Sequence, residues 1–199
     1  MTTRNSLPNK HGSQRGGGGR AGRRSGAAIC LSLLLLVAPC RALEPGDAAP
    51  DFELPGSDGE RYRLSEVLAS PGTQGVVLAW YPRAFTSGCT IECKSFARNG
   101  HLIEDYAVSF FMISVDQVEE NTRFADAMEA DFPLLSDASK ATATAYGVLH
   151  QDRFALRTNF YIDASGEILA IDRNVDPETA AQDVAARLRE LRIGKKSAP

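Results

Sequence analysis

The first 42 residues contain no aspartate or glutamate, although they hold seven of the chain's 22 lysines and arginines. Residues 43–199 therefore contain 15 basic and 25 acidic residues, for a formal net charge of −10. An acidic body is repelled by a phosphate backbone, which argues against a nucleic-acid partner. No internal repeat divides this body, and about 155 residues suffice for one domain with a sizeable core.

Cysteine is scarce as well. Cys30 and Cys40 lie in the acid-free segment, so the body retains only Cys89 and Cys93. Two cysteines four residues apart do not make the disulfide framework that staples small secreted domains. The spacing is typical of a redox pair or of metal ligands.

The acid-free segment has the features of a targeting leader. Several arginines precede an apolar run over residues 27–38 that is too short for a comfortable membrane span. Cys40-Arg41-Ala42 then offers a small-x-small cleavage site. We expect an exported, periplasmic or otherwise extracytoplasmic protein whose mature domain does not insert stably into a membrane.

This interpretation gives three parts: a signal peptide with a disordered basic region over 1–42, a domain over 43–194 and a tail over 195–199. A twin-arginine signal at Arg23-Arg24, a lipoprotein site at Cys40 and an organelle transit peptide remain alternatives.

Two apolar, partly β-branched runs, Val76–Trp80 and Val108–Val115, predict strands that are covered on both faces. Two hairpins are expected, one from 51–54 and 61–64 and one from 158–163 and 167–172, with a helical turn at 65–68 and an extended piece at 134–135. Three further helices are expected. One runs from an Asp116/Glu119 capping box to about Ala130, one from Asp137 to Tyr146 and is ended by Gly147, and the last is capped by Asp176 and ended by Gly194. This order predicts an α/β sandwich with a mixed sheet.

A helix is also predicted directly after the first buried strand. Cys89, Cys93 and Phe96 recur at helical spacing and share one face, and Thr86 or Ser87 can cap the helix. Cys89 then lies in the first turn, where free N–H groups and the helix dipole stabilise an anion. Because the thiolate is the nucleophilic form of cysteine, this position favours a reactive thiol.

These residues resemble the active site of the peroxiredoxin family (AhpC/TSA type). Pro82-x-x-x-Thr86-x-x-Cys89 matches the family pattern, and Trp80-Tyr81-Pro82 with Gly88-Cys89-Thr90 resembles its Q-type, or bacterioferritin-comigratory-protein, branch. Further similar stretches are 132–137, 145–148 and Arg157-x-x-Phe160-x-Ile162-Asp163, so that the similarity covers roughly residues 46–192. The resemblance implies a thioredoxin-like fold, with a mixed central sheet flanked by helices and an N-terminal β-hairpin.

The resemblance also implies the activity and the residues that carry it. The expected protein is an antioxidant, thioredoxin-dependent peroxidase that reduces hydrogen peroxide and organic hydroperoxides through a sulfenic acid at Cys89. Arg157 matches the arginine placed over the cysteine, Thr86 would hydrogen-bond the sulfur, and Pro82 would shield it. Asn159 departs from the usual threonine. The resemblance further implies that a thioredoxin-like or other thiol compound reduces the enzyme and that the enzyme is a monomer or weak dimer. It implies no cofactor and no metal.

The role of Cys93 stays open. Q-type enzymes commonly place a resolving cysteine five residues after the reactive one, whereas the spacing here is four. Cα atoms at i and i+4 of a helix lie about 6 Å apart, but their Cβ bonds run nearly parallel, so a Cys89–Cys93 disulfide requires the first turn to unwind. Alternatively, Cys93 fills the core beside Phe96 and an external thiol resolves the sulfenic acid. Glu92 is interpreted as a solvated helix residue.

A second class of function is a thioredoxin-fold copper metallochaperone. Cys-x-x-x-Cys is a metal-ligand spacing, thiolates suit Cu(I), and His150 could complete the set. Against it, Lys94 occupies the position where such proteins carry proline, and the cationic Arg157 would repel a metal ion. A disulfide oxidoreductase would instead require Cys-x-x-Cys.

Overall fold

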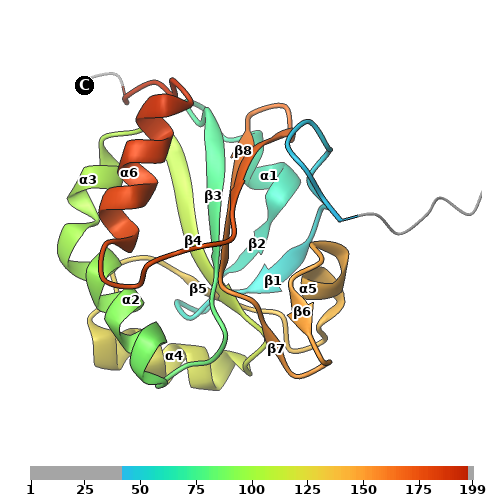
Figure 1. The fold of residues 1–199 in the computed structure, drawn as a ribbon, viewed down its shortest axis with the longest axis vertical. Coiled ribbons are helices and arrows are strands. Elements are labelled where there is room, and N and C mark those ends of the chain that lie inside the picture. Colours follow the sequence, from blue (N-terminus) through green and yellow to red (C-terminus); the bar gives the residue numbers. More distant parts are fainter. Residues whose placement is uncertain (1–41, 197–199) are drawn as a thin grey trace, which may run out of the picture. The chain divides into compact units, whose positions relative to one another are not determined.

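We describe residues 42–196 of a computed structural model of the chain; all but the last residue of the predicted leader over 1–42 and most of the predicted tail over 195–199 therefore lie outside the described residues. A five-stranded mixed sheet forms the centre, in the order β5-β4-β3-β8-β9 (Figure 1). These strands are β5 (Leu134–Ser136), β4 (Val108–Ser114), β3 (Gly75–Trp80), β8 (Thr158–Asp163) and β9 (Ile168–Asp172). β3, β4 and β5 run parallel, while β8 is antiparallel to both β3 and β9.

The central strand β3 is buried along its whole length, as its apolar run predicts. Val76, Leu78 and Trp80 join a hydrophobic cluster on one face of the sheet, whereas Val77 and Ala79 join a separate cluster on the other face. A strand between two cores needs apolar residues at consecutive positions rather than alternation. Buried on both faces, β3 gives firm support to the loop that follows its carboxyl end.

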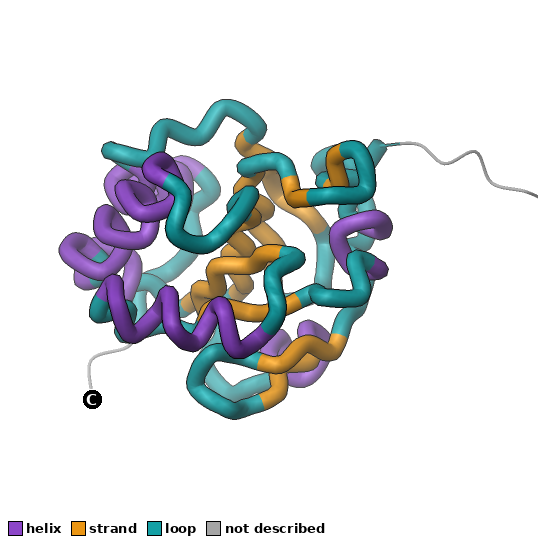
Figure 2. Tube along the Cα trace, turned by 90° about the horizontal axis from the view of Figure 1, so that it is seen from below, coloured by secondary structure: helices purple, strands orange, loops and turns teal. Residues whose placement is uncertain are grey.

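Helices cover both faces of the sheet (Figures 1 and 2). The face that carries Cys89 is covered by α2 (Ser87–Asn99), α3 (His101–Glu104), α4 (Val118–Met128) and α6 (Ala180–Glu190). The other face packs against α1 (Leu64–Leu68), α5 (Ala141–Ala145) and the hairpin of β1 (Glu53–Pro55) and β2 (Arg61–Arg63). The predicted α/β fold with an N-terminal hairpin is confirmed.

A small hairpin of β6 (Leu149–His150) and β7 (Phe154–Ala155) precedes β8 and was not predicted. Strands of two residues are too short to produce a periodic pattern, so the sequence carries little sign of them. The hairpin matters because the chain leaves it at Leu156 and reaches Arg157 immediately before β8.

The predicted starts of three helices and the end of one are wrong. α4 has Gln117 at its N-cap, without a side-chain cap, so Asp116 and Glu119 form no capping box. α5 begins at Ala141 instead of directly after Asp137. α6 begins at Ala180 and ends at Glu190; the Asp176 carboxylate accepts a hydrogen bond from Glu178 N in the turn before it. The carboxylates of Asp116 and Asp176 accept from backbone N–H groups outside the helices, whereas Asp137 Oδ2 accepts from Ala143 N in the first turn of α5 at 2.7 Å.

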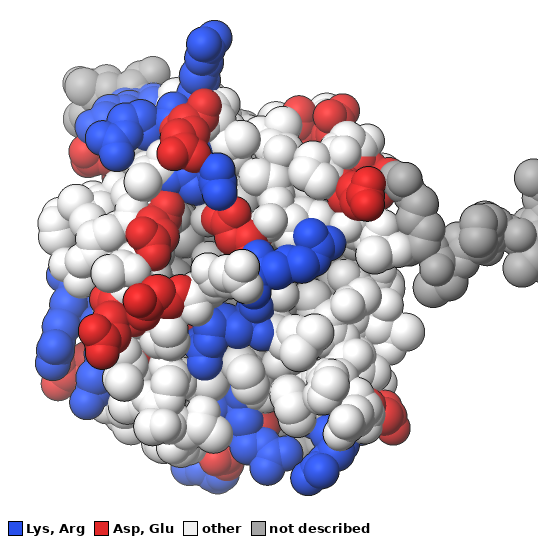
Figure 3. Space-filling model, viewed as in Figure 1, with Lys and Arg blue, Asp and Glu red and all other residues white. Residues whose placement is uncertain are grey.

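Positive and negative side chains are interspersed on the face of the molecule seen in Figure 3. Within residues 42–196, no helix is both long and apolar enough to cross a membrane.

Candidate active site

Cys89 lies at the start of α2, shortly after the carboxyl end of β3. A loop over residues 81–86 leaves the carboxyl end of β3 and leads into α2, whose first turn contains Cys89 (Figure 1). The thiol points into the core beneath the helix and has no solvent-exposed area. Cys89 is a free thiol, at the end of a helix where unpaired N–H groups favour an anion.

Arg157 reaches the same place from β8. The register pairs Trp80 with Thr158, so Arg157 stands beside the point where the chain leaves β3. Its Nη2 lies 3.4 Å from Cys89 Sγ, close enough for an N–H···S hydrogen bond. A guanidinium at this distance stabilises a thiolate through charge and through a directed donor together.

Gly88 makes room for this contact. A Cβ at position 88 would stand 3.2 Å from Arg157 Nη2, closer than most carbon–nitrogen contacts. With any larger residue, the guanidinium would have to shift by a few tenths of an ångström. This is a physical reason for the glycine immediately before Cys89.

Glu92 is not the solvated residue that the sequence analysis expected. Its side chain is fully buried, and Oε2 forms an ion pair with Nη1 of Arg157. Burial raises the pKa of Glu92 to about 7, while the charge of Arg157 partly offsets that rise. Glu92, Arg157 and Cys89 thus form one connected cluster, with the arginine in the middle.

A sequence signal for Glu92 did exist. It lies three residues after Cys89, so the two side chains share a face of α2. A carboxylate on the buried face requires a partner, and the arginine expected over Cys89 was the available cation. Among residues 42–196, Glu92 Oε1 has no hydrogen-bond partner.

Cys93 lies one turn further along α2 and is fully buried beside Phe96. This is the position expected if Cys93 fills the core. Burial raises its pKa to about 12, with smaller contributions from Glu92 and Cys89. In this conformation Cys93 is therefore a protonated, unreactive thiol. It is not bonded to Cys89.

The loop before α2 holds the two remaining expected site residues. Thr86 is the N-cap residue of α2, but its hydroxyl donates to the carbonyl of Arg83 at 3.0 Å instead of capping the helix or reaching the sulfur. Pro82 is half-buried at the start of the loop. Phe85 has a left-handed backbone (φ 59°), which is uncommon for a residue other than glycine and costs about 1–3 kcal/mol.

Asn159 sits on β8 two residues after Arg157 and is almost fully buried. Two residues along a strand point to the same face, so Asn159 lies under the helices that cover Cys89. Its Oδ1 has no hydrogen-bond partner among residues 42–196.

The described residues do not assemble the ligands expected of a copper site. No group of three or more His, Cys, Asp or Glu side chains within residues 42–196 is placed to hold a metal ion. His150 instead packs on Phe154, with ring centroids 5.2 Å apart.

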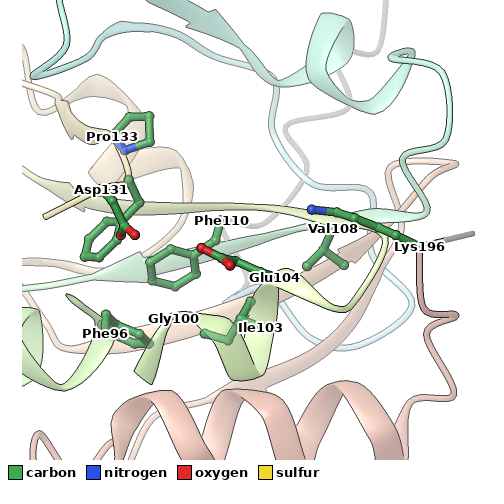
Figure 4. Close-up of a pocket in the computed structure, with 10 residues that line it drawn as sticks. Phe96, Gly100, Ile103, Glu104, Val108, Phe110, Asp131, Pro133 and Lys196 are labelled. Atoms are coloured by element: carbon green, nitrogen blue, oxygen red, sulfur yellow. The ribbon is translucent and has the colours of Figure 1, made fainter. Parts of the chain in front are cut away.

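A cavity of about 170 Å³ lies near the carboxyl end of α2, at Phe96 and Gly100 (Figure 4). Apolar side chains line it together with the charged side chains of Glu104, Asp131 and Lys196. Val108 is the first residue of β4, whereas the active-site loop follows the carboxyl end of the parallel strand β3. The cavity is therefore separate from the thiol chemistry.

Comparisons with known proteins agree with this geometry. The family model described as "AhpC/TSA family" matches residues 45–171. A putative peroxiredoxin of Mycobacterium tuberculosis is 37% identical over 157 residues, which is 76% of this chain and all of that protein. Peroxiredoxin Bcp of Escherichia coli is 34% identical over 133 residues, or 63% of this chain and 83% of that protein.

A solved structure leads to the same family. The crystal structure of peroxidoxin BcpB from Mycobacterium tuberculosis superimposes with a TM-score of 0.67 at 33% identity, covering 74% of this chain and 97% of that one. The copper-chaperone alternative finds no support in these similarities. The chain belongs to the AhpC/TSA family and is a peroxiredoxin, a thiol-dependent peroxidase.

Proposed function

We propose that Cys89 is the peroxidatic cysteine and that the enzyme reduces hydrogen peroxide and organic hydroperoxides. The observation that carries this assignment is the 3.4 Å contact between Arg157 Nη2 and Cys89 Sγ at the N-terminus of α2. The thiolate attacks the terminal oxygen of the hydroperoxide and the O–O bond breaks. Sulfur is oxidised to a sulfenic acid, and the other oxygen leaves as an alkoxide or hydroxide that takes up a proton.

Arg157 has two tasks in this step. It stabilises the thiolate before attack, and its N–H groups can follow the negative charge as that charge moves to the leaving oxygen. Pro82 limits the access of water to the sulfur. The Thr86 hydroxyl forms a hydrogen bond in the reacting site after it turns from Arg83 toward the bound peroxide. This turn is a rotation about a single bond.

Glu92 acts through Arg157 and is a positioning residue. Its Oε2 holds Nη1, which leaves Nη2 directed at Cys89. An arginine side chain has several rotatable bonds, so fixing one end of the guanidinium lowers the entropy that would otherwise be lost in the reaction.

Cys93 is proposed as the resolving cysteine. Its thiolate would attack the sulfenic sulfur of Cys89, forming the disulfide and displacing hydroxide, which takes up a proton to give water, and a dithiol reductant would then restore both thiols. Burial and the raised pKa of Cys93 oppose this step in the folded helix. Resolution therefore requires the first turns of α2 to unwind, which exposes Cys93 and lets it ionise.

The remaining proposals rest on the sequence and on the family resemblance. A thioredoxin-like protein regenerates an enzyme that acts as a monomer or weak dimer. Residues 1–42 direct export and are removed, residues 43–194 form the peroxidase domain, and 195–199 form a tail.

Intact mass distinguishes the two fates of the sulfenic acid. We expect one equivalent of hydrogen peroxide to remove two hydrogens from the wild-type domain, because Cys93 closes a disulfide. Cys93→Ser should instead give a sulfenic acid that dimedone traps, whereas Cys89→Ser should lose turnover altogether. A trapped adduct on the wild type would show that an external thiol resolves the enzyme, and peroxidase turnover by Cys89→Ser would exclude Cys89 as the nucleophile.

Replacing Arg157 tests the cation. Arg157→Ala removes a donor directed at the developing charge, so the second-order rate constant for oxidation should fall by about 10²–10³-fold in stopped-flow measurements. Arg153→Ala, which removes an exposed arginine from the preceding turn, is the matched control. Equal rates for Arg157→Ala and the control would remove Arg157 from the mechanism.

Glu92 predicts a pH dependence of stability. A folded-state pKa of about 7, above the usual 4.5, means that the folded protein holds the proton more tightly than the unfolded chain. The stabilisation that this proton gives the folded state is complete below about pH 4.5 and is lost as pH rises through about 7. Between pH 5 and 8 the wild type should therefore lose up to about 3 kcal/mol of unfolding free energy relative to Glu92→Gln.

Urea unfolding at both pH values measures this difference. Glu119→Gln, which removes an exposed carboxylate from α4, serves as the control. A constant difference between wild type and Glu92→Gln from pH 5 to 8 would show that Glu92 does not titrate in this range.

Export is tested on the full chain. If residues 1–42 form a cleaved signal, N-terminal sequencing of the exported protein should begin at Leu43. A lipid-modified N-terminus at Cys40 would indicate the lipoprotein route instead, and an intact Met1 on the active protein would exclude a cleaved leader.

A further inference from the structure

Asp116, which the sequence places in a helix cap, makes a different contact. It follows β4 by two residues, and its Oδ2 accepts a hydrogen bond from Ala84 N at 2.8 Å. Ala84 belongs to the loop between β3 and α2, five residues before Cys89. The carboxylate therefore joins the active-site loop to the neighbouring parallel strand.

Asp116 is itself held from several directions. Ser114 Oγ lies 3.1 Å from Oδ2 and accepts a hydrogen bond from Asp116 N, also at 3.1 Å. Ser136 donates to the Asp116 carbonyl at 2.6 Å. Both serines are buried, so the carboxylate presents a fixed acceptor to Ala84.

The same network reaches the other end of the loop. Asn121, fully buried on α4, accepts a hydrogen bond from the Tyr81 hydroxyl at 2.7 Å and lies 3.1 Å from Ser114 Oγ. Its Nδ2 donates to the carbonyl of Leu135 in β5 at 2.9 Å. Tyr81 and Ala84, both within the loop, are thus tied to the ends of β4 and β5 and to α4.

The part of the loop that follows Ala84 contains an unfavourable backbone conformation. Phe85 follows Ala84 directly and has the uncommon left-handed backbone, and Thr86 is the N-cap residue of α2. Without the bond at Ala84, a relaxation of Phe85 would displace Thr86 and the first turn of α2. That turn carries Cys89 to within reach of Arg157.

We propose that Asp116 is a positioning residue for the reaction with peroxide: through Ala84 it fixes the loop that sets the first turn of α2. This role rests on the proposed reaction of Cys89. It depends on where the acceptor oxygen stands and not on the negative charge.

Two substitutions separate position from charge. Asp116→Asn keeps an acceptor oxygen in place and removes the charge, whereas Asp116→Glu keeps the charge and moves it by one methylene group. We expect Asp116→Asn to oxidise within about threefold of the wild-type rate and Asp116→Glu and Asp116→Ala to be at least tenfold slower. Glu119→Ala, which removes an exposed carboxylate three residues away, is the matched control.

Stopped-flow fluorescence of the single tryptophan, Trp80, which is buried immediately before the loop, follows the oxidation by hydrogen peroxide. Alkylation of Cys89 by iodoacetamide in the Cys93→Ser background reports how open the first turn is. With the loop released, alkylation should become faster while peroxide oxidation becomes slower. Thermal melts confirm that each variant is folded at the assay temperature.

The outcomes are distinguishable from failure of the proposed function. If the wild type shows no Cys89-dependent oxidation, the assignment of Cys89 fails, and the role of Asp116 fails with it. If the wild type reacts, and folded Asp116→Glu and Asp116→Ala are oxidised as fast as the wild type, the positioning role alone is overturned. Equal slowing of Asp116→Asn and Asp116→Ala would also overturn it, because charge and not position would then matter.

Discussion

The ion pair between Arg157 and Glu92 is the constraint on which the site depends. A buried guanidinium or carboxylate is costly unless each finds its partner, so the two must enter the core together. They meet only when α2 packs over the strand that follows Arg157. Because β8 is aligned with β3 by their register, the pairing that satisfies Glu92 also brings Arg157 to Cys89. The packing that pairs Glu92 with Arg157 therefore also assembles the thiolate site.

The sequence predicted the parts of the site that local patterns determine. The apolar run of β3, the helical spacing of Cys89 and Cys93, and the strand after Arg157 all specify which face a residue occupies. It did not predict Glu92, because a single charged residue on a helix is usually exposed. Its burial depends on a partner 65 positions away, and only the expected place of Arg157 could have revealed it.

Helix starts were predicted less well, for a related reason. A capping pattern is local, but the carboxylate or hydroxyl that forms it can also be taken by backbone groups elsewhere. Asp116 contacts the loop at Ala84, and Thr86 contacts Arg83, while α2 and α4 begin without side-chain caps. At the carboxyl ends of the parallel strands, several chain segments meet and compete for the same few polar groups. Sequence patterns give no measure of that competition.

The two cysteines place opposite demands on α2. Cys89 needs the first turn intact, since only then do the helix N-terminus and Arg157 act on its sulfur. Cys93 is unreactive while the helix is intact, because burial holds its pKa near 12. If both cysteines react in one cycle, the helix must be folded for the first step and open for the second. The energy that holds the first turn closed therefore sets both the rate of peroxide attack and the delay before resolution, and a helix without a side-chain cap suits a turn that has to open in every cycle.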